Sequence, residues 1–143
     1  MEEKINQVIV LLEIFRILRT KENRNGRKKL YEIFIDYTKT KNSNLFISNK
    51  KIIDQIQGDF DEIGFLFQKY ILDENLFFEI YSDTVRRIWI SLRQQIKEER
   101  NKRLENDPSG SKFLLYFEKL AIDAKDYRDK MNLSEPGFTD FRN

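Results

Sequence analysis

Three carboxylates on one short segment are the residues best suited to chemistry in this chain. Asp59, Asp61 and Glu62 stand together, and the spacing of Asp59 and Glu62 places both on one helix face. Carboxylate oxygens are the ligands that Mg²⁺ prefers, so a metal-dependent enzyme with further ligands from another helix is one hypothesis. Because Phe60 and Ile63 keep helical spacing beside them, we favour a simpler interpretation, a helix with a solvated acidic face.

Two arginines beside the single tryptophan form a second candidate site. Arg86, Arg87 and Trp89 could together bind an anion or a nucleotide through charge and stacking. In the alternative interpretation Trp89 belongs to the core. The arginines would then form ion pairs with Glu79 and Asp83 along the same helix.

A cluster of basic residues near the N-terminus is the third candidate. Its members are Arg16, Arg19, Lys21, Arg24, Arg27, Lys28 and Lys29. A basic helical face is typical of nucleic-acid binding, but the isoelectric point of 8.7 lies below the usual range for such domains and no known fold signature accompanies the cluster. Net charge also alternates along the chain, from +8 over residues 16–51 to −7 over 52–84 and +5 over 85–103. This alternation suits oppositely charged helices that pack side by side.

The residue types that are missing exclude several kinds of chemistry. The 143 residues include no Cys and no His, which excludes disulfides, thiol catalysis and the commonest general base. No Gly-rich phosphate loop, nucleophile elbow or EF-hand loop is present. We therefore predict no catalytic residues, no bound metal and no cofactor.

The elements that must position these residues are helical. Apolar residues recur every three or four positions along the chain, and no alternation typical of strands persists. We expect helices over residues 5–19, 48–67, 74–103 and 113–124. A further helix is expected to begin at Thr20 or just after Gly26 and to end at 37. Residues 39–49 are expected to form a loop. The fold prediction is all-α, a single-domain bundle of five or six helices over residues 1–131. A tail, residues 132–143, carries Phe138 and Phe141.

The first helix is expected to bury one broad apolar face. That face would hold Ile5, Val8, Ile9, Leu12, Phe15 and Leu18. The apolar stretch from 5 to 18 is shorter than the roughly 20 residues that a membrane span needs. We interpret it as a core helix, with a helix lying in the membrane interface as the alternative. The acidic start of the chain does not suit a secretory signal, and together with the lack of Cys it favours the cytoplasm.

The chain resembles a bacterial all-helical family, the domain of unknown function DUF4760, over about residues 8–121. The resemblance is carried by Leu12-Glu13-x-Phe15-Arg16, Glu22-x-Arg24, Phe60-x-x-Ile63-Gly64, Tyr70-x-Leu72-Asp73-Glu74, Ile80-Tyr81-x-Asp83, Arg87-x-Trp89-x-x-Leu92, Ile96-x-Glu98-x-Arg100 and Phe117-Glu118-x-Leu120. It implies a helical domain without an established activity, often preceded by a transmembrane helix. We expect this chain to lack such a helix, and no catalytic residues are carried over.

These observations favour a non-enzymatic cytosolic helical module that binds a protein partner or a second copy of itself. The alternative is binding of a nucleic acid or a nucleotide through a basic helical face. The binding candidates are Arg16, Arg19, Arg24, Arg27, Lys28, Lys29, Arg86, Arg87 and Trp89.

Overall fold

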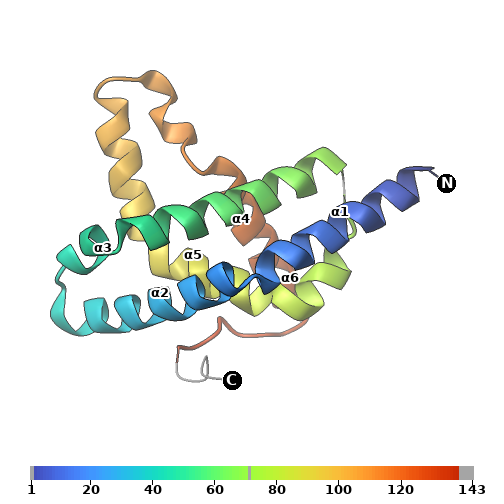
Figure 1. Ribbon diagram of the computed structural model, residues 1–143, viewed down its shortest axis with the longest axis horizontal. Coiled ribbons are helices and arrows are strands. Elements are labelled where there is room, and N and C mark those ends of the chain that lie inside the picture. Colours follow the sequence, from blue (N-terminus) through green and yellow to red (C-terminus); the bar gives the residue numbers. More distant parts are fainter. Residues whose placement is uncertain (1, 71, 139–143) are drawn as a thin grey trace.

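The computed structural model describes residues 2–70 and 72–138, and the regular structure of these residues is entirely helical. In chain order the elements are α1 (Glu2–Arg19), α2 (Lys21–Thr40), the short α3 (Asn44–Ser48), α4 (Lys50–Tyr70), α5 (Glu74–Leu104), the 3₁₀ turn η1 (Pro108–Lys112) and α6 (Leu115–Lys130). They form one bundle, so the all-α prediction is confirmed (Figure 1). Phe141 lies outside the described residues.

Side-chain caps set two of the helix starts that the sequence suggested. Thr20 Oγ accepts a hydrogen bond from the backbone N–H of Asn23 at 3.1 Å, so α2 begins before Gly26 and not after it. The side chain of Asp73 accepts from the N–H of Asn75 at 3.0 Å and caps α5. Figure 1 shows α1 and α2 following one another with a bend between them.

The predicted loop at 39–49 is partly wrong, because it contains the helix α3. Phe46 of α3 is buried, and its ring centroid lies 5.2 Å from that of Tyr37 in an edge-to-face contact. Burial of this ring anchors α3 against the end of α2. Ile47, by contrast, stays 69% exposed.

The helix α4 supplies the central apolar stripe of the bundle. Its buried side chains include Ile53, Ile56, Phe60, Ile63 and Phe67, and among them Phe60 and Ile63 are the two whose helical spacing was noted in the sequence. These pack against α1, α2 and α6. At Gly64 the backbone of α6 comes so close that an added Cβ would lie 2.2 Å from the carbonyl oxygen of Tyr116. The glycine therefore permits close approach of α4 and α6.

The buried face of α1 is not the one that the sequence suggested. Ile14, Ile17 and Leu18 are buried, whereas the first three turns leave Ile5 and Leu12 more than half exposed. The expected inward stripe is therefore wrong for these turns. The helix presents Val10 and Leu11 to the core instead.

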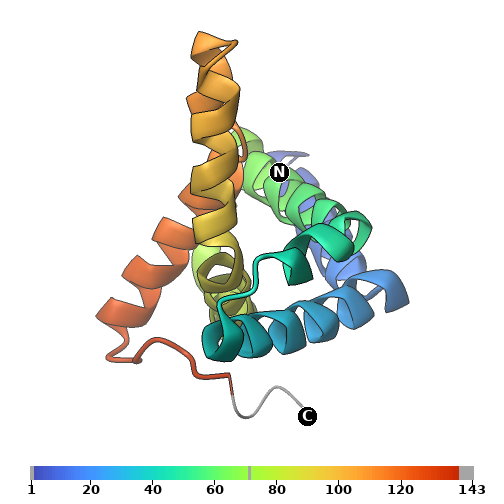
Figure 2. The ribbon, with the colours of Figure 1, turned by 90° about the vertical axis from the view of Figure 1, so that its left-hand side faces the viewer.

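The end of α5 stands out from the bundle together with η1 (Figures 1 and 2). The guanidinium of Arg103 lies 3.8 Å from the ring centroid of Phe113, and Arg100 Nε donates to the Phe113 carbonyl at 2.8 Å. The charged segment 97–103 thus projects into solvent, and η1 packs against its C-terminal end at Arg103 and Leu104.

Candidate interaction surfaces

The helix α1 carries an apolar surface that no part of the described chain covers. Its members, which we call the α1 stripe, are exposed at 54% for Ile5, 56% for Val8, 58% for Ile9 and 60% for Leu12. At 100° per residue these four positions share the side of the helix opposite Ile14 and Leu18, which are both fully buried. The helix is therefore apolar on both sides, and only one side is packed.

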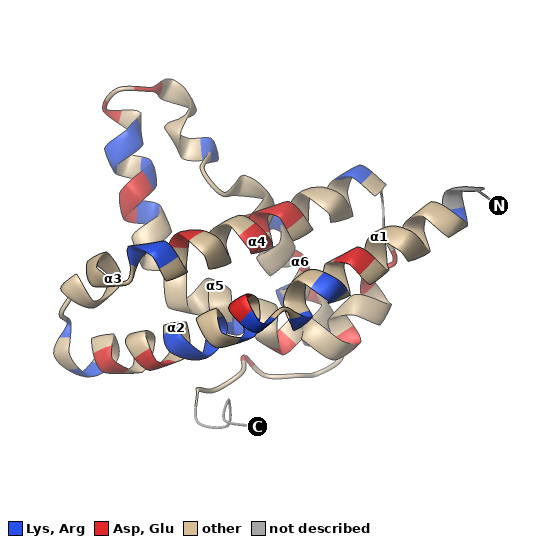
Figure 3. Cartoon of the chain, in the orientation of Figure 1, with Lys and Arg blue, Asp and Glu red and all other residues tan. Residues whose placement is uncertain are grey.

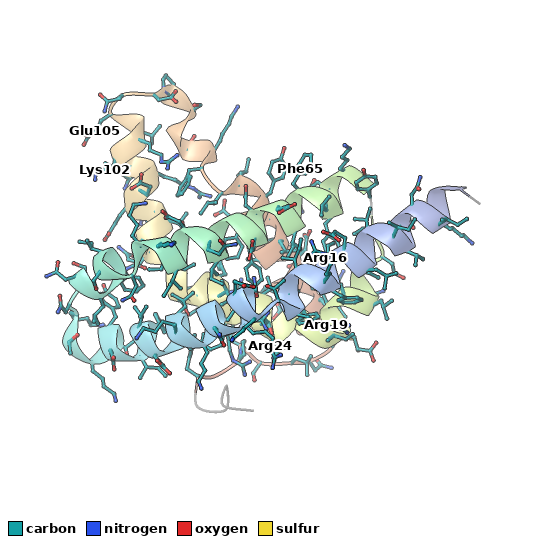
Figure 4. All side chains as sticks on the ribbon, viewed as in Figure 1. Arg16, Arg19, Arg24, Phe65, Lys102 and Glu105 are labelled. Atoms are coloured by element: carbon teal, nitrogen blue, oxygen red, sulfur yellow. The ribbon has the colours of Figure 1, made fainter. Side chains whose placement is uncertain are left out.

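Two arginines continue the exposed face of α1 beyond the stripe. Arg16 and Arg19 follow Leu12 by four and seven residues, so both lie on the same side of the helix. Arg16 is exposed and ion-paired with Glu13, with 2.9 Å from Nε to Oε2. Arg19 is exposed too, with its guanidinium 5.6 Å from the ring centroid of Phe15. Figure 4 labels both arginines near the junction of α1 and α2.

Arg16 also borders a shallow, mostly acidic hollow between α4 and the α1–α2 junction. The hollow has a volume of about 260 Å³ and is lined by Glu13, Arg16, Ile17, Thr20, Glu22, Gln55, Asp59 and Glu62. Four carboxylates face a single guanidinium there, so the hollow repels phosphate. The hydrogen bonds that Arg16 donates to Glu13 raise the pKa of Arg16 and lower the pKa of Glu13.

The predicted basic cluster on α2 divides into exposed and inward-facing residues. Arg24, Lys28 and Lys29 are exposed, and Figure 3 shows basic and acidic residues interspersed along the helix. Arg27 is instead half-buried, and its electrostatic neighbours are Tyr31 of α2 and Tyr81 and Asp83 of α5. Burial lowers the pKa of its guanidinium, and Nη1 has no hydrogen-bond partner among the described residues. Arg27 is thus less accessible to a ligand than Arg24, Lys28 and Lys29.

The second predicted site is occupied by contacts within the chain. Arg86 is only 4% exposed and binds Glu135 through two hydrogen bonds, at 2.8 Å and 2.7 Å. Arg87 binds Asp83 at 3.0 Å, and the Trp89 ring lies edge-to-face on Phe117 with centroids 5.1 Å apart. Of the expected ion pairs within the helix, Arg87–Asp83 is present, whereas Arg86 pairs with Glu135 of the tail instead. Trp89 packs against the core, as the alternative interpretation expected. The structure does not bring the three residues together around an open pocket.

Two of the three candidate carboxylates of α4, Asp59 and Asp61, are engaged with neighbouring helices. Asp59 Oδ2 accepts a hydrogen bond from Asn23 Nδ2 at 2.8 Å, across to α2. Asp61 Oδ1 accepts from the backbone N–H of Phe117 at 3.0 Å. Within residues 2–70 and 72–138, no group of three or more acidic side chains could hold a metal ion. The metal-enzyme hypothesis therefore finds no ligand set there.

Another open hollow, of about 560 Å³, lies between the end of α5 and η1. Its walls are mostly polar and charged, with Arg103 and Phe113 stacked on one side. Basic and acidic residues are mixed around it, including Lys102, Asp107 and Lys112. We find no arrangement of a nucleophile and a base in it.

The described part of the C-terminal tail, residues 132–138, is held against the bundle. The Phe138 ring lies between those of Tyr31 and Phe34, at centroid distances of 6.0 Å and 4.8 Å. Arg87 Nε donates to the Gly137 carbonyl at 2.7 Å. The helical part ends at Lys130, and the tail crosses the face formed by α2, α5 and α6 (Figure 2).

The α1 stripe is the surface that sequence reasoning missed. A signal was present, because Val10, Leu11, Ile14 and Ile17 add apolar residues outside the expected face. A helix that is apolar on all sides is typical of one buried on all sides. Here one side lacks a partner within the described chain.

Comparison with known proteins gives a family and no function. The model of the domain of unknown function DUF4760 matches residues 4–123. No curated protein and no solved structure is significantly similar to the chain. Among the described residues, no helix has the length and hydropathy needed to cross a bilayer. The match spans most of the 143 residues, so the chain belongs to the DUF4760 family.

Proposed function

We propose that this chain is a non-enzymatic cytoplasmic interaction module that binds a protein partner through the α1 stripe. The observation that carries the proposal is the stripe itself, four aliphatic side chains that are each more than half exposed on one helix face. Contiguous exposed apolar surface is typical of a binding site rather than of ordinary protein surface. The engagement of the candidate carboxylates in structural hydrogen bonds also favours binding over catalysis.

The stripe is large enough to support binding but not a permanent assembly. Complete burial of an aliphatic side chain contributes about 1.5–3 kcal/mol. Covering the exposed parts of these four side chains therefore contributes about 3–7 kcal/mol before the cost of association. A partner must add contacts of its own around the rim, which suits a reversible complex.

The chemistry of this face indicates what the partner presents. The apolar part extends from Ile5 to Leu12, two helical turns, and Arg16 and Arg19 follow on the same face. An amphipathic helix with a short aliphatic stripe and an acidic residue placed to meet Arg19 complements this order, because Arg16 is already paired with Glu13. We therefore commit to such a helix of a protein partner as the occupant.

Two features favour this occupant over a lipid surface. A helix that lies in a membrane interface is typically rich in Lys and Arg opposite its apolar face and carries aromatic residues on it. Here the side opposite the stripe packs on α4, and the stripe contains aliphatic residues only.

The test compares protein capture by three forms of the full chain. Wild type, Ile9→Glu/Leu12→Glu and Ile47→Glu are immobilised and exposed to native lysate. Ile47 is an exposed aliphatic residue on α3, away from α1 (Figure 1), and is the matched control. We expect wild type and the control to retain the same protein and the double variant to lose it. Equal capture by all three forms, or capture by none, contradicts the proposal.

Binding of nucleic acid is the second candidate function, favoured by the exposed Arg24, Lys28 and Lys29 on α2. Contacts with phosphate must weaken steeply as salt increases. An electrophoretic mobility-shift assay with single-stranded and duplex oligonucleotides at increasing salt tests nucleic-acid binding. The variant for comparison is Arg24→Gln/Lys28→Gln. A shift that decreases with salt and is lost in the variant supports this function. Absence of a shift at low salt excludes it.

A further inference from the structure

The tail after α6 is bound by the bundle in the way that a peptide ligand is bound. It lies beyond residue 123, where the match to the family ends, and runs without helix from 133 to 137. Arg128 donates to the Ser134 carbonyl at 3.1 Å from Nε and 2.7 Å from Nη2. Arg87 donates to the Gly137 carbonyl at 2.7 Å. Contacts to backbone carbonyls position an extended segment without regard to its side chains.

Arg86 provides a subsite that requires a carboxylate. The side chain is buried, and its Nη1 donates to the carbonyl of Ala121 at 3.1 Å. Its other bonds, from Nε and Nη2, go to the Glu135 carboxylate in parallel. In the described part of the chain, Glu135 is the carboxylate that Arg86 binds. Burying a guanidinium without a counter-ion is costly, so the bundle is complete only when a carboxylate fills this position.

An aromatic subsite lies three residues further along the tail. The Phe138 ring contacts the rings of Tyr31 and Phe34 on α2, edge-to-face with the first. The segment Ser134-Glu135-Pro136-Gly137-Phe138 therefore meets the bundle at two carbonyls, one carboxylate and one ring. Four contacts over five residues define a pattern, Glu-x-x-Phe in extended conformation.

From these contacts we infer that α2, α5 and α6 form a peptide-binding surface for Glu-x-x-Phe segments, which the chain's own tail covers in cis. A partner carrying such a segment would replace the tail. This surface is distinct from the α1 stripe and does not depend on it. Because a tethered segment competes at an effective concentration of about millimolar, an outside peptide binds the wild-type chain more weakly than a chain with a loosened tail.

The experiment uses a fluorescein-labelled Ser-Glu-Pro-Gly-Phe peptide and measures its anisotropy with the full chain. In the variant Glu135→Gln/Phe138→Ala the tail loses its carboxylate and its ring. We expect this variant to bind the peptide at least about tenfold more tightly than wild type does. The same peptide with Gln in place of Glu should bind the variant at least about tenfold more weakly, since Arg86 then lacks a carboxylate. The Glu peptide should also raise the melting temperature of the variant and leave that of wild type unchanged.

A milder variant covers the case in which the double variant does not fold. Phe138→Ala alone keeps the buried Arg86–Glu135 pair and weakens only the ring contact. We expect a gain of a few-fold in peptide affinity over wild type. Circular dichroism shows which variants are folded. If a folded variant gains no peptide affinity over wild type, the proposed binding surface is overturned. Equal binding of the Glu and Gln peptides overturns it too. Either result leaves the proposed function of the α1 stripe standing.

Discussion

Asp61 links two helices through one hydrogen bond, and its loss should be measurable. Leu114 precedes α6 in a left-handed conformation, with φ of 57°, and provides no side-chain cap. The Asp61 carboxylate of α4 serves instead, by accepting from the N–H of Phe117. We expect Asp61→Ala to lower the free energy of unfolding by about 1–2 kcal/mol in urea denaturation. Asp54→Ala, which removes only an exposed pair with Lys50, should cost less than about 1 kcal/mol. Equal effects of the two changes would refute this role.

Tyr31 should make stability fall at high pH. Burial raises its pKa from 10.0 to about 12, against the opposing effect of Arg27 and Arg87. A group with a raised pKa in the folded state contributes stability that is fully present below pH 10.0 and lost as pH rises toward 12. The loss should reach about 2–3 kcal/mol. Urea unfolding across this range checks it, with Tyr31→Phe as the control. An equally steep decline in the control would contradict this assignment.

The sequence identified several candidate residues, but it did not predict which partners their side chains bind. The sequence places Arg86 on a helix beside Arg87 and Trp89, yet its partner Glu135 lies 49 residues away. Likewise, Asp61 is used by a helix that begins more than 50 residues later. Helical periodicity describes neighbours within a few turns and carries no information about such distant pairs. Whether an arginine binds a ligand or a residue of its own chain could therefore be decided only from the three-dimensional structure.

The close approach of α4 and α6 gives a matched pair of glycine substitutions. A Cβ at Gly64 would lie 2.2 Å from the backbone oxygen of Tyr116, whereas nothing lies within 4 Å of one at Gly58. Gly58→Ala should stabilise the chain by up to about 1 kcal/mol through helix propensity. Gly64→Ala forces the two helices apart and should cost more than about 2 kcal/mol. Urea midpoints of the two variants measure this contrast, and a stabilising Gly64→Ala would be inconsistent with the packing.

The two sides of α1 should respond differently to the same truncation. Leu18 is fully buried, so Leu18→Ala should cost about 2–5 kcal/mol through lost burial and a cavity. Leu12 is 60% exposed, and Leu12→Ala should change the stability by less than about 0.5 kcal/mol. Both changes remove the same atoms, which makes the comparison direct. A large loss on Leu12→Ala would show that the stripe is covered within the chain.

Periodicity predicted α4 well and α1 poorly for one physical reason. The apolar residues of α4 lie on one face, so a single orientation buries them. In α1 they are spread around the helix, with Val10 and Leu11 filling the gap between Ile9 and Leu12. Two opposite faces were therefore equally suited to the core. The choice depends on which face α4 covers.

At the scale of the whole molecule, apolar packing rather than charge pairing sets the arrangement. The core holds Phe60, Phe77, Phe78 and Phe117, all fully or almost fully buried. Among the ion pairs of the described residues, Arg86–Glu135 and Arg100–Glu118 join different elements, and the rest lie within single helices. The alternating net charge therefore does not act through pairs between oppositely charged helices there. The bundle itself was predictable because it depends on apolar spacing, which the sequence displays.

The most direct test of the central claim places a photoreactive benzophenone side chain at one position of the full chain in cells. One form carries it in place of Leu12 on the α1 stripe, and the other in place of Ile47, which is similarly exposed on α3. We predict that irradiation links the first form, and not the second, to a distinct protein. Absence of a protein adduct at Leu12, or the same adducts at both positions, would contradict the account.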